Sequence, residues 1–558
     1  MIYQEKKNLL HQYMEKSYIT QEQFNIALKM SSTSHYSIDN ILLACGFISA
    51  EEVAKVKSIR LDTQYVDLSK FQPQEEALSL IPREKAIELT ILPIMLQNGK
   101  LVIAIDARED FKHKYMLETL TNCKITFVLS SKQEIINHLT NHKYFTQDDE
   151  ILDKINILKK QSLENIDIVH LVDLLIEDAI EDDVSDIHIS PEKEIINVFF
   201  RLEGVLTHYH SLPKEFHQRI VSRIKILANL DISQTQLPQD GTIEYNYLYN
   251  DYRLRVSSIS TEYGENIVMR LLKNNMADLS LNSLGLTESN KRKLAQLFKQ
   301  PNGLLLITGP TGSGKTTTLY SALKEIDSLS KNIITVEDPI EYQIPFIKQT
   351  QINTQIGYNF LTAIRAFMRQ DPDVILIGEI RDQETAEIAL RASITGHLVF
   401  STLHTNDAIG AIARLKDLNI PNYLIGSATI AIVAQRLIRN LCNHCKTLIK
   451  NPQEQLKKYA VQEELLKEYK EFTIYEPKGC DRCKGNGYSG RSIILEILQI
   501  DKHIEEFITE SKSSIEILAY AKSQGMSDML NDGHMKVLKG ITSFEEISRV
   551  VADRKFFE

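Results

Sequence analysis

The sequence predicts a multidomain α/β protein, and three observations support this prediction. First, 558 residues are more than one hydrophobic core normally organises, so several domains are expected. Second, short apolar runs alternate with helical patterns over residues 276–440, which is typical of a largely parallel sheet covered by helices on both faces. Third, hydrophobic residues make up 43% and charged residues 25% of the chain, an ordinary balance for folded domains.

The N-terminal residues 1–60 are predicted to be a small helical docking module. Thr20 and Ser49 are each followed three residues later by Gln or Glu, which is the capping-box pattern of a helix start. The repetition of this pattern indicates a short internal repeat.

A small α+β domain is expected at residues 61–140, where two apolar runs flank Asn98-Gly99 as in a β-hairpin. Pro93 makes the first of these strands an edge strand, because proline cannot donate to a ladder. The polar residues 141–165 are then predicted to be a linker. Four regions complete the chain: an α+β domain at 166–275, a phosphate-loop domain at 276–440, a cysteine-bearing insert at 441–491 and a helical region at 492–558.

A phosphate-binding loop is the most specific motif. The apolar run 304–308 is followed by Gly309, four residues, and then Gly314, Lys315 and Thr316. Glycines let several backbone N–H groups converge on one anion, and a helix begins behind them. Lys315 would reach the β- and γ-phosphates, and Thr316 would hold Mg²⁺. The residues expected to bind a nucleoside triphosphate are Gly309, Pro310, Thr311, Gly312, Ser313, Gly314, Lys315, Thr316 and Thr317. A glycine-rich turn with a chance lysine is the alternative.

Two further strands end in acids. The run 332–336 leads into Glu337, with Glu341 four residues on, and the run 374–377 is followed by Gly378 and Glu379. Acids at the carboxyl ends of parallel strands lie where α/β sheets bind ligands. Glu337 or Glu341 could orient the attacking water in phosphoanhydride hydrolysis or accept its proton. The alternative is that these acids merely cap a polar turn. Glu379 stands at the end of a strand like Walker B, where it would hold Mg²⁺ through a water shell.

Arginines and histidines add weaker signals. Arg365 and Arg369 share one helix face, from which they would stabilise developing phosphate charge in the same chain or a neighbouring subunit. A solvated arginine pair is the alternative. His397 and His404 flank an apolar run, and a histidine at a strand end can sense a γ-phosphate or simply be buried in the core.

Six cysteines are present, and four form two Cys-x-x-Cys pairs, Cys442 with Cys445 and Cys480 with Cys483. Two such pairs can close a structural zinc site. A redox-active dithiol is the alternative.

The net charge of −10 disfavours a protein that coats nucleic acid, since such proteins carry a basic surface. No run approaches eighteen apolar residues, and the N-terminus lacks a signal-peptide pattern, so a cytosolic protein is expected.

Together the motifs resemble the secretion ATPases of bacterial type II secretion and type IV pilus assembly. The resemblance runs from about residue 185 to residue 551, and its most specific segments are 309–320, 335–342, 369–382, 395–408 and 435–439. It implies a RecA-like P-loop ATPase domain preceded by a PAS-like α+β domain and an N-terminal docking domain, with an insert in which four cysteines bind zinc. ATP, Mg²⁺ and Zn²⁺ are the implied cofactors.

The resemblance also implies residue roles. The segment 335–342 matches the family's Asp box, with Glu337 as the expected catalytic glutamate and Glu341 as its alternative. His397 and His404 match the His box, with His404 expected in the site, and Arg365 and Arg369 match the paired arginines. Arg255 and Arg270, in the domain before the P-loop, are candidates to reach the nucleotide.

For the whole protein, the resemblance implies a homohexamer at the cytoplasmic face of the inner membrane. It would bind a membrane platform protein and the cytoplasmic domain of an inner-membrane assembly protein, and drive pseudopilus assembly in type II secretion. The extension ATPase of a type IV or competence pilus is the alternative. A DNA translocase and a scaffold that does not hydrolyse ATP are the hypotheses from other functional classes, and no nucleic-acid partner is expected.

The chain departs from the family at several positions. Thr235, Gln236 and Thr242 replace basic residues around Leu-Pro-Gln-Asp-Gly, and Glu203 replaces an aspartate in a turn. Some members bind cyclic di-GMP through an Arg-Leu-Gly signature in each N-terminal repeat. Because the second repeat has Tyr36-Ser37-Ile38 instead, no such binding is expected.

Overall fold

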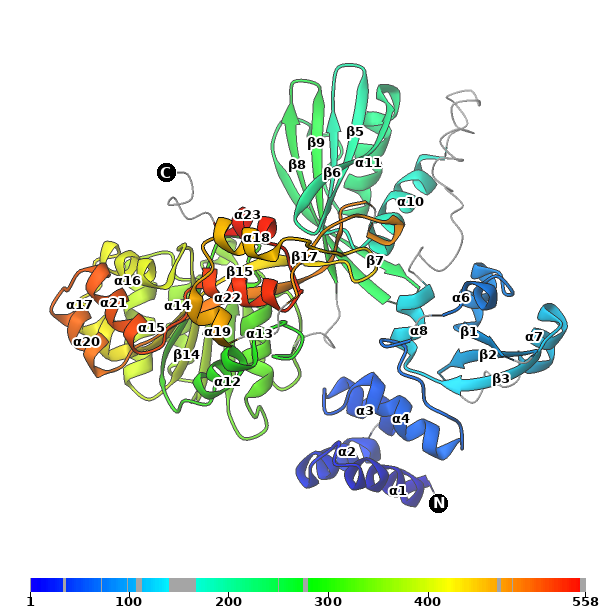
Figure 1. The fold of residues 1–558 in the computed structure, drawn as a ribbon, viewed down its shortest axis with the longest axis horizontal. Helices are drawn as coiled ribbons and strands as arrows, with labels where there is room; N and C mark the ends of the chain where they lie inside the picture. The colour runs from blue at the N-terminus through cyan, green and yellow to red at the C-terminus, as the bar shows by residue number, and fades with distance from the viewer. Residues whose placement is uncertain are drawn as a thin grey trace. The chain divides into compact units, whose positions relative to one another are not determined.

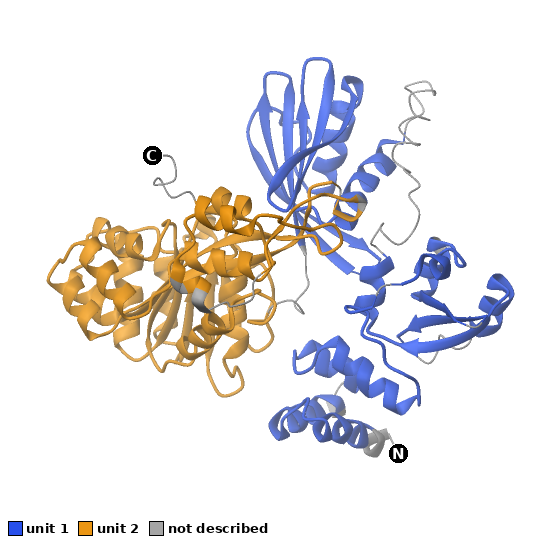
Figure 2. Ribbon diagram, in the orientation of Figure 1, with its two compact units in different colours: residues 1–274 blue, residues 275–558 orange. Residues whose placement is uncertain are grey.

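The structure, a computed structural model, describes residues 2–33, 37–71, 73–97, 99–106, 113–139, 167–248, 250–273, 280–468, 473–483 and 485–551. The chain forms two compact units, residues 1–274 and 275–558, and each is described by itself (Figure 2). The predicted linker at 141–165 lies outside the described residues. Over the ranges given above, no helix is both long and apolar enough to cross a bilayer.

The N-terminal module consists of helices α1 (Ile2–Glu15), α2 (Gln21–Thr33), α3 (Ile38–Ala44) and α4 (Ala50–Arg60). Both predicted capping boxes form. The Gln23 N–H donates to Thr20 Oγ1 at 3.2 Å while the Thr20 N–H donates to the Gln23 side chain at 2.8 Å. Ser49 and Glu52 make the same reciprocal pair at the start of α4. Tyr36, which entered the cyclic di-GMP prediction, lies outside the described residues.

The second domain is built on a three-stranded sheet in the order β1-β2-β3 (Figure 1). Strands β1 and β2 pair antiparallel, as the predicted hairpin requires, although Asn98 of its turn is outside the described residues. Pro93 lies in the edge strand β1, next to a shift in register. The elements are α5 (Glu75–Leu78), α6 (Arg83–Leu89), β1 (Leu92–Gln97), β2 (Lys100–Ile105), α7 (Lys114–Thr121), β3 (Lys124–Leu129) and α8 (Lys132–Leu139).

The third domain of this unit is an antiparallel sheet of six strands in the order β6-β5-β4-β9-β8-β7. Helices α10 and α11 share one hydrophobic core with the sheet, as expected for the α+β domain. The elements are α10 (Ile168–Glu181), β4 (Asp186–Pro191), β5 (Ile195–Leu202), β6 (Val205–Pro213), η4 (Lys214–Phe216), α11 (His217–Leu227), β7 (Gln239–Tyr247), β8 (Asn250–Thr261) and β9 (Gly264–Lys273).

The second unit contains a sheet of seven strands in the order β12-β11-β13-β14-β10-β15-β18. All neighbours pair in parallel except β15 and β18. Alternate residues of β10 enter different cores, Leu304 and Leu306 on one face, Leu305 and Ile307 on the other. Both faces are therefore covered, as the continuous apolar runs predict.

The elements up to the last parallel strand are α12 (Glu288–Leu297), β10 (Gly303–Thr308), α13 (Lys315–Glu325), β11 (Ile333–Glu337), β12 (Lys348–Gln351), η6 (Thr354–Ile356), α14 (Phe360–Phe367), β13 (Val374–Ile377), α15 (Gln383–Ile394), β14 (Leu398–Leu403), α16 (Ala408–Asp417), α17 (Asn422–Ala428) and β15 (Thr429–Leu441). The remaining elements are β16 (Thr447–Leu448), α18 (Pro452–Lys458), α19 (Glu463–Glu468), β17 (Tyr475–Glu476), η7 (Asp481–Cys483), β18 (Tyr488–Gln499), α20 (Lys502–Thr509), α21 (Ser514–Ser523), α22 (Met529–Leu538) and α23 (Phe544–Val550).

Strand β18 corrects two predicted boundaries. It lies beyond the cysteines and pairs antiparallel with β15, so the sheet does not end at residue 440. Residues 492–499 are strand where a helical region was predicted, because Ile493, Ile494, Leu495 and Leu498 are buried in the cores on the two faces. The cysteine insert is thus an excursion between two neighbouring strands of one sheet.

The C-terminal helices α20–α23 pack onto this sheet as part of its larger core. A buried carboxylate fixes the last of them: Glu546 accepts from the Arg439 backbone N–H at 2.9 Å and from the Arg439 guanidinium at 2.7 Å. Burial opposes ionisation of Glu546, but the arginines Arg549 and Arg439 hold its pKa below the usual value.

Candidate nucleotide-binding site and metal centre

The predicted phosphate loop joins β10 to α13 at the carboxyl edge of the sheet. Gly309 has φ of 150°, and a Cβ there would lie 2.5 Å from Ser313 Oγ and 2.6 Å from the Gln435 carbonyl oxygen. Gly314, with φ of 85°, is the N-cap of α13. The turn therefore needs glycine at both positions. The exposed N-terminus of α13, with Thr316 in its first turn, carries the partial positive charge that attracts anions.

Two groups of the loop suit a phosphate ligand. The Lys315 ammonium donates to the carbonyl oxygens of Gly309 at 2.8 Å and Pro310 at 3.1 Å, so it lies over the loop. Burial lowers its pKa, Glu379 opposes this and Arg436 adds to it. The buried Ser313 hydroxyl has no hydrogen-bond partner among the described residues. A triphosphate would supply acceptors for both groups.

Glu379 lies at the same edge, just beyond β13. Its Oε2 contacts His404 Nε2 at 3.1 Å, and its Oε1 forms an ion pair with Arg381. Burial favours the neutral acid, but Arg381 and His404 hold the pKa of Glu379 below its usual value. The carboxylate is therefore charged at neutral pH, as a ligand of hydrated Mg²⁺ must be.

Glu337, at the end of β11, and Glu341, four residues later, differ in exposure. Glu337 is the last residue of the strand and is only 4% exposed. Its oxygens accept from the Tyr320 hydroxyl, from Thr335 Oγ1 at 2.5 Å and from Gln349 Nε2 at 3.2 Å. Burial raises its pKa although these donors oppose the shift. Glu341 is half-buried. In this arrangement Glu341 is the acid with more access to water.

His404 and His397 lie at opposite edges. Thr308 pairs with Leu403, so His404 follows the carboxyl end of β14 next to the phosphate loop. His397 precedes the amino end of β14, where its carbonyl oxygen accepts from the Gly303 N–H at 3.1 Å. Its ring Nδ1 lies 2.8 Å from the Ala392 carbonyl oxygen, as in a satisfied structural histidine.

The two predicted arginines also lie toward the amino edge. Arg365 is in the last turn of α14, and Arg369 donates to its carbonyl oxygen at 2.9 Å. Just beyond, the Asn332 side chain, which precedes β11, donates to the Gln370 carbonyl oxygen at 2.7 Å. Both arginines are exposed. They are not brought to the phosphate loop of their own chain.

Several residues at the site were not singled out from the sequence. Gln435 of β15 donates to the Ser313 carbonyl oxygen at 2.7 Å and accepts from Thr318 Oγ1 at 3.0 Å. Arg436 donates to the Asn406 carbonyl oxygen at 3.0 Å, and its charge acts on Lys315. The segment 435–439 was noted as similar to the family, but a strand residue gives no signal of which loop it will support.

In the other unit, Arg255 and Arg270 are paired across β8 and β9. They alternate with core residues such as Val256 and Met269, so they lie on the sheet face away from α10 and α11. Arg270 Nε donates to Asp186 at 2.8 Å. Burial opposes ionisation of Asp186, but this bond and the charge of Arg270 lower its pKa.

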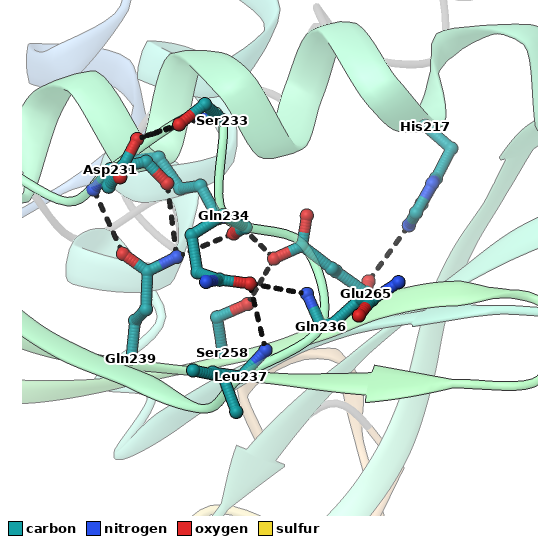
Figure 3. A network of polar contacts seen from close by, with 10 residues as sticks. His217, Asp231, Ser233, Gln234, Gln236, Leu237, Gln239, Ser258 and Glu265 are labelled. Carbon is teal, nitrogen blue, oxygen red and sulfur yellow. Dashed lines mark hydrogen bonds and ion pairs between the residues drawn. The ribbon is translucent and has the colours of Figure 1, made fainter.

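The loop that departs from the family is held by a polar network (Figure 3). Gln239 exchanges hydrogen bonds with Asp231, accepting from its N–H at 2.9 Å and donating to its carbonyl oxygen at 3.0 Å. The Gln234 side chain accepts from the N–H groups of Gln236 and Leu237. The fully buried Lys225 pairs with Glu265, which also accepts from Ser258 at 2.9 Å. Gln236, which stands where the family is basic, thus presents its backbone to this network.

The four predicted metal ligands come together between β15 and β18. The sulfur atoms of Cys442, Cys445, Cys480 and Cys483 all lie within 4.8 Å of one another. Separations of 3.7 Å and 4.0 Å are close to the edge of a tetrahedron around zinc, about 3.8 Å for Zn–S bonds of about 2.3 Å. These separations are also far too long for a disulfide. The geometry fits a closed four-thiolate zinc site.

The fold and the loop define a P-loop nucleotide-binding protein with a cysteine-rich insert. A family model described as "Type II/IV secretion system protein" matches residues 161–549, and an MshEN domain model matches residues 61–149. The chain therefore belongs to the type II/IV secretion system protein family, whose members are ATPases of secretion and pilus assembly.

Named relatives point to both systems. The type IV pilus assembly ATPase PilB of Thermus thermophilus is 36% identical over 529 residues, 91% of this chain and 58% of that protein. The chain thus spans little more than half of that relative. The type II secretion system protein E of Aeromonas hydrophila is 42% identical over 386 residues, 69% of this chain and 76% of that protein.

Among solved structures, the ATPase DotB of Legionella pneumophila aligns with a TM-score of 0.51 at 21% identity, covering 68% of this chain and 94% of that one. At this identity the likeness supports the fold alone.

Proposed function

We propose that this chain hydrolyses Mg-ATP and uses the energy to drive pseudopilus assembly in type II protein secretion. The observation that carries the proposal is the meeting of the phosphate loop, Glu379 and His404 at one edge of the sheet. A glycine loop alone would bind phosphate. A charged acid beside the lysine adds a place for the metal that phosphoryl transfer requires.

In the proposed mechanism, the loop amides and Lys315 neutralise the triphosphate as the bond to the γ-phosphate breaks. Thr316 and the water shell held by Glu379 are the proposed Mg²⁺ contacts. His404 keeps Glu379 oriented and is the proposed sensor of the γ-phosphate. These roles supply positioning and charge, which is most of what this reaction needs from a protein.

An acid of the 337–341 segment is proposed to orient the attacking water. The family resemblance favours Glu337 as this acid. The burial of Glu337 instead favours Glu341, because Glu341 has more access to water. Glu337→Gln and Glu341→Gln separate them: the variant of the catalytic acid should keep ATP affinity and lose about 10²-fold or more in kcat, as expected for a lost general base.

The proposed assembly is a homohexamer at the cytoplasmic face of the inner membrane. Arg365 and Arg369 are proposed to stabilise charge on the nucleotide, and Arg255 and Arg270 of the proposed PAS-like domain are further candidates to contact it. Its proposed partners are a membrane platform protein and the cytoplasmic domain of an inner-membrane assembly protein. The four cysteines are proposed to hold zinc, which would fix the excursion between β15 and β18. The absence of cyclic di-GMP binding stays a prediction.

Pilus extension is the second candidate, because the match to a pilus assembly ATPase extends over 91% of the chain. The deciding experiment purifies the full chain and measures Mg-ATP hydrolysis alone and with the platform proteins of each system. Stimulation by the type II proteins supports the first candidate, and stimulation by the pilus proteins alone supports the second. A chain that neither binds nor hydrolyses Mg-ATP in any combination contradicts both.

A further inference from the structure

A tyrosine hydroxyl links the helix behind the phosphate loop to the acidic segment after β11. Tyr320 lies on α13, five residues beyond Lys315, and is 1% exposed. Its hydroxyl donates to Glu337 Oε2 and accepts from the Glu341 backbone N–H at 3.1 Å. One oxygen atom therefore contacts both ends of the segment that holds the two candidate acids.

The Glu337 carboxylate is held from three elements. Besides Tyr320 of α13, it accepts from Thr335 Oγ1 on β11 at 2.5 Å and from Gln349 Nε2 on β12 at 3.2 Å. Such a set of donors leaves the carboxylate little freedom, and it fixes the point at which the chain leaves the sheet. Removing one donor would leave a buried acid partly unsatisfied.

Helix α13 couples the position of the phosphate loop to the position of the Tyr320 hydroxyl. Lys315 and Tyr320 are separated by about 7.5 Å along a continuous helix, which moves as a rigid element. Any shift of the phosphate loop on nucleotide binding would therefore be carried to the Tyr320 hydroxyl. Tyr320 also packs edge-on against the Tyr342 ring at 5.8 Å, so its ring serves the core as well. Removing only the hydroxyl therefore tests the link to the acid segment while the ring keeps its packing in the core.

We propose that Tyr320 is a positioning residue for ATP hydrolysis: its hydroxyl ties the acids of residues 337–341 to the helix that begins at the phosphate loop. The proposal rests on the proposed function, and it holds whether Glu337 or Glu341 is the catalytic acid. Occupation of the loop then sets the acid segment before chemistry begins, a form of preorganisation.

The test is Tyr320→Phe in the full chain, which keeps the ring and removes the hydroxyl. We expect kcat to fall tenfold or more while KM and the affinity for a non-hydrolysable ATP analogue change by less than twofold. Tyr358→Phe is the matched control, because the Tyr358 hydroxyl donates to Thr350 Oγ1 at 3.0 Å in the same unit. The control should keep wild-type kcat. Wild-type kcat in Tyr320→Phe, or equal losses in both variants, overturns the proposal.

A double variant tests whether the hydroxyl acts through the acid segment. In the background of whichever variant, Glu337→Gln or Glu341→Gln, removes the catalytic acid, Tyr320→Phe should lower kcat by less than twofold further, because residues acting as a unit are not additive. A full additional tenfold loss would show that the hydroxyl acts elsewhere and would overturn the proposal.

Hydrogen exchange on the wild-type chain needs no variant. The Glu341 amide should gain tenfold or more protection when the non-hydrolysable analogue binds, and unchanged exchange with the analogue bound overturns the proposal. This measurement also distinguishes a failure of the proposed function from a failure of the Tyr320 proposal. A chain that binds the analogue and protects Glu341 but never hydrolyses ATP contradicts the proposed function and leaves this link standing.

Discussion

At the scale of single residues, Lys315 is the side chain whose removal has the clearest consequence. In Lys315→Ala we expect ATP hydrolysis to fall by about 10²-fold or more, because no other charge replaces the ammonium that meets the transferred phosphate. Turnover and ATP affinity of the purified variant give the result. Lys324→Ala, an exposed lysine further along α13, is the control and should behave as wild type. Near-normal turnover in Lys315→Ala would contradict the P-loop assignment.

His534 makes the stability of the second unit sensitive to acid. It is 1% exposed on α22, and burial lowers its pKa to about 4 from 6.5, although Asp528 opposes the shift. Below pH 6.5 His534 binds a proton in the unfolded chain but not in the folded chain. The free energy of unfolding therefore decreases as the pH is lowered, until the pH reaches the pKa of His534 in the folded chain. Between pH 7 and pH 5 this loss is about 2 kcal/mol.

His534→Gln should remove this contribution. The variant is expected to lose about 2 kcal/mol less than wild type between pH 7 and pH 5 in urea unfolding. His503→Gln, an exposed histidine on α20, serves as control and should keep the wild-type dependence. Equal losses in wild type and His534→Gln would show that His534 is not the acid-sensitive group.

At the scale of elements, the paired cysteine turns between β15 and β18 are expected to hold one zinc ion per chain. Cys480→Ser should release it, because three thiolates no longer close a tetrahedral site. Native mass spectrometry of the purified chain measures the metal, and Cys123→Ser, an isolated cysteine, should keep it. A wild-type chain that carries no metal after purification in zinc-containing medium would contradict the assignment.

Much of the nucleotide site was predictable because each piece is local. The strand at 304–308, the glycine loop and the helix behind it follow one another in the sequence, and β10 and α13 agree with that order within a residue. Glu379 and His404 each follow an apolar run, and parallel strands bring such ends to one edge.

What the sequence could not predict depends on contacts between distant segments. Strand β18 joins the sheet only because it returns to β15 after the cysteine excursion. The burial of Glu337 depends on Tyr320 and Gln349, which come from two other elements. His397 and His404 look equivalent in sequence, yet a strand of six residues separates them and places them at opposite edges. Neither periodicity nor spacing contains this information.

At the scale of the whole molecule, the position of Arg369 bears on whether one chain or two would supply the residues of an ATP site. Arg369 lies near the amino ends of the strands, since its neighbour Gln370 contacts Asn332 just before β11, whereas Lys315 lies at the carboxyl ends. The five residues of β11 span about 16 Å between these edges. If Arg369 acts on a nucleotide, we therefore expect that nucleotide to be bound by a neighbouring subunit, in the head-to-tail contact that closes a ring.

Mixing two inactive variants tests this expectation. Lys315→Ala and Arg369→Ala chains should each hydrolyse ATP poorly, but random mixed rings would contain about one site in four with both residues intact, and activity should recover toward that fraction. Lys315→Ala mixed with Glu379→Gln is the control, because both changes affect the same chain's site and no intact site can form. Since mass spectrometry can verify that chains exchange, mixed rings without recovered activity would mean that Arg369 does not act between subunits.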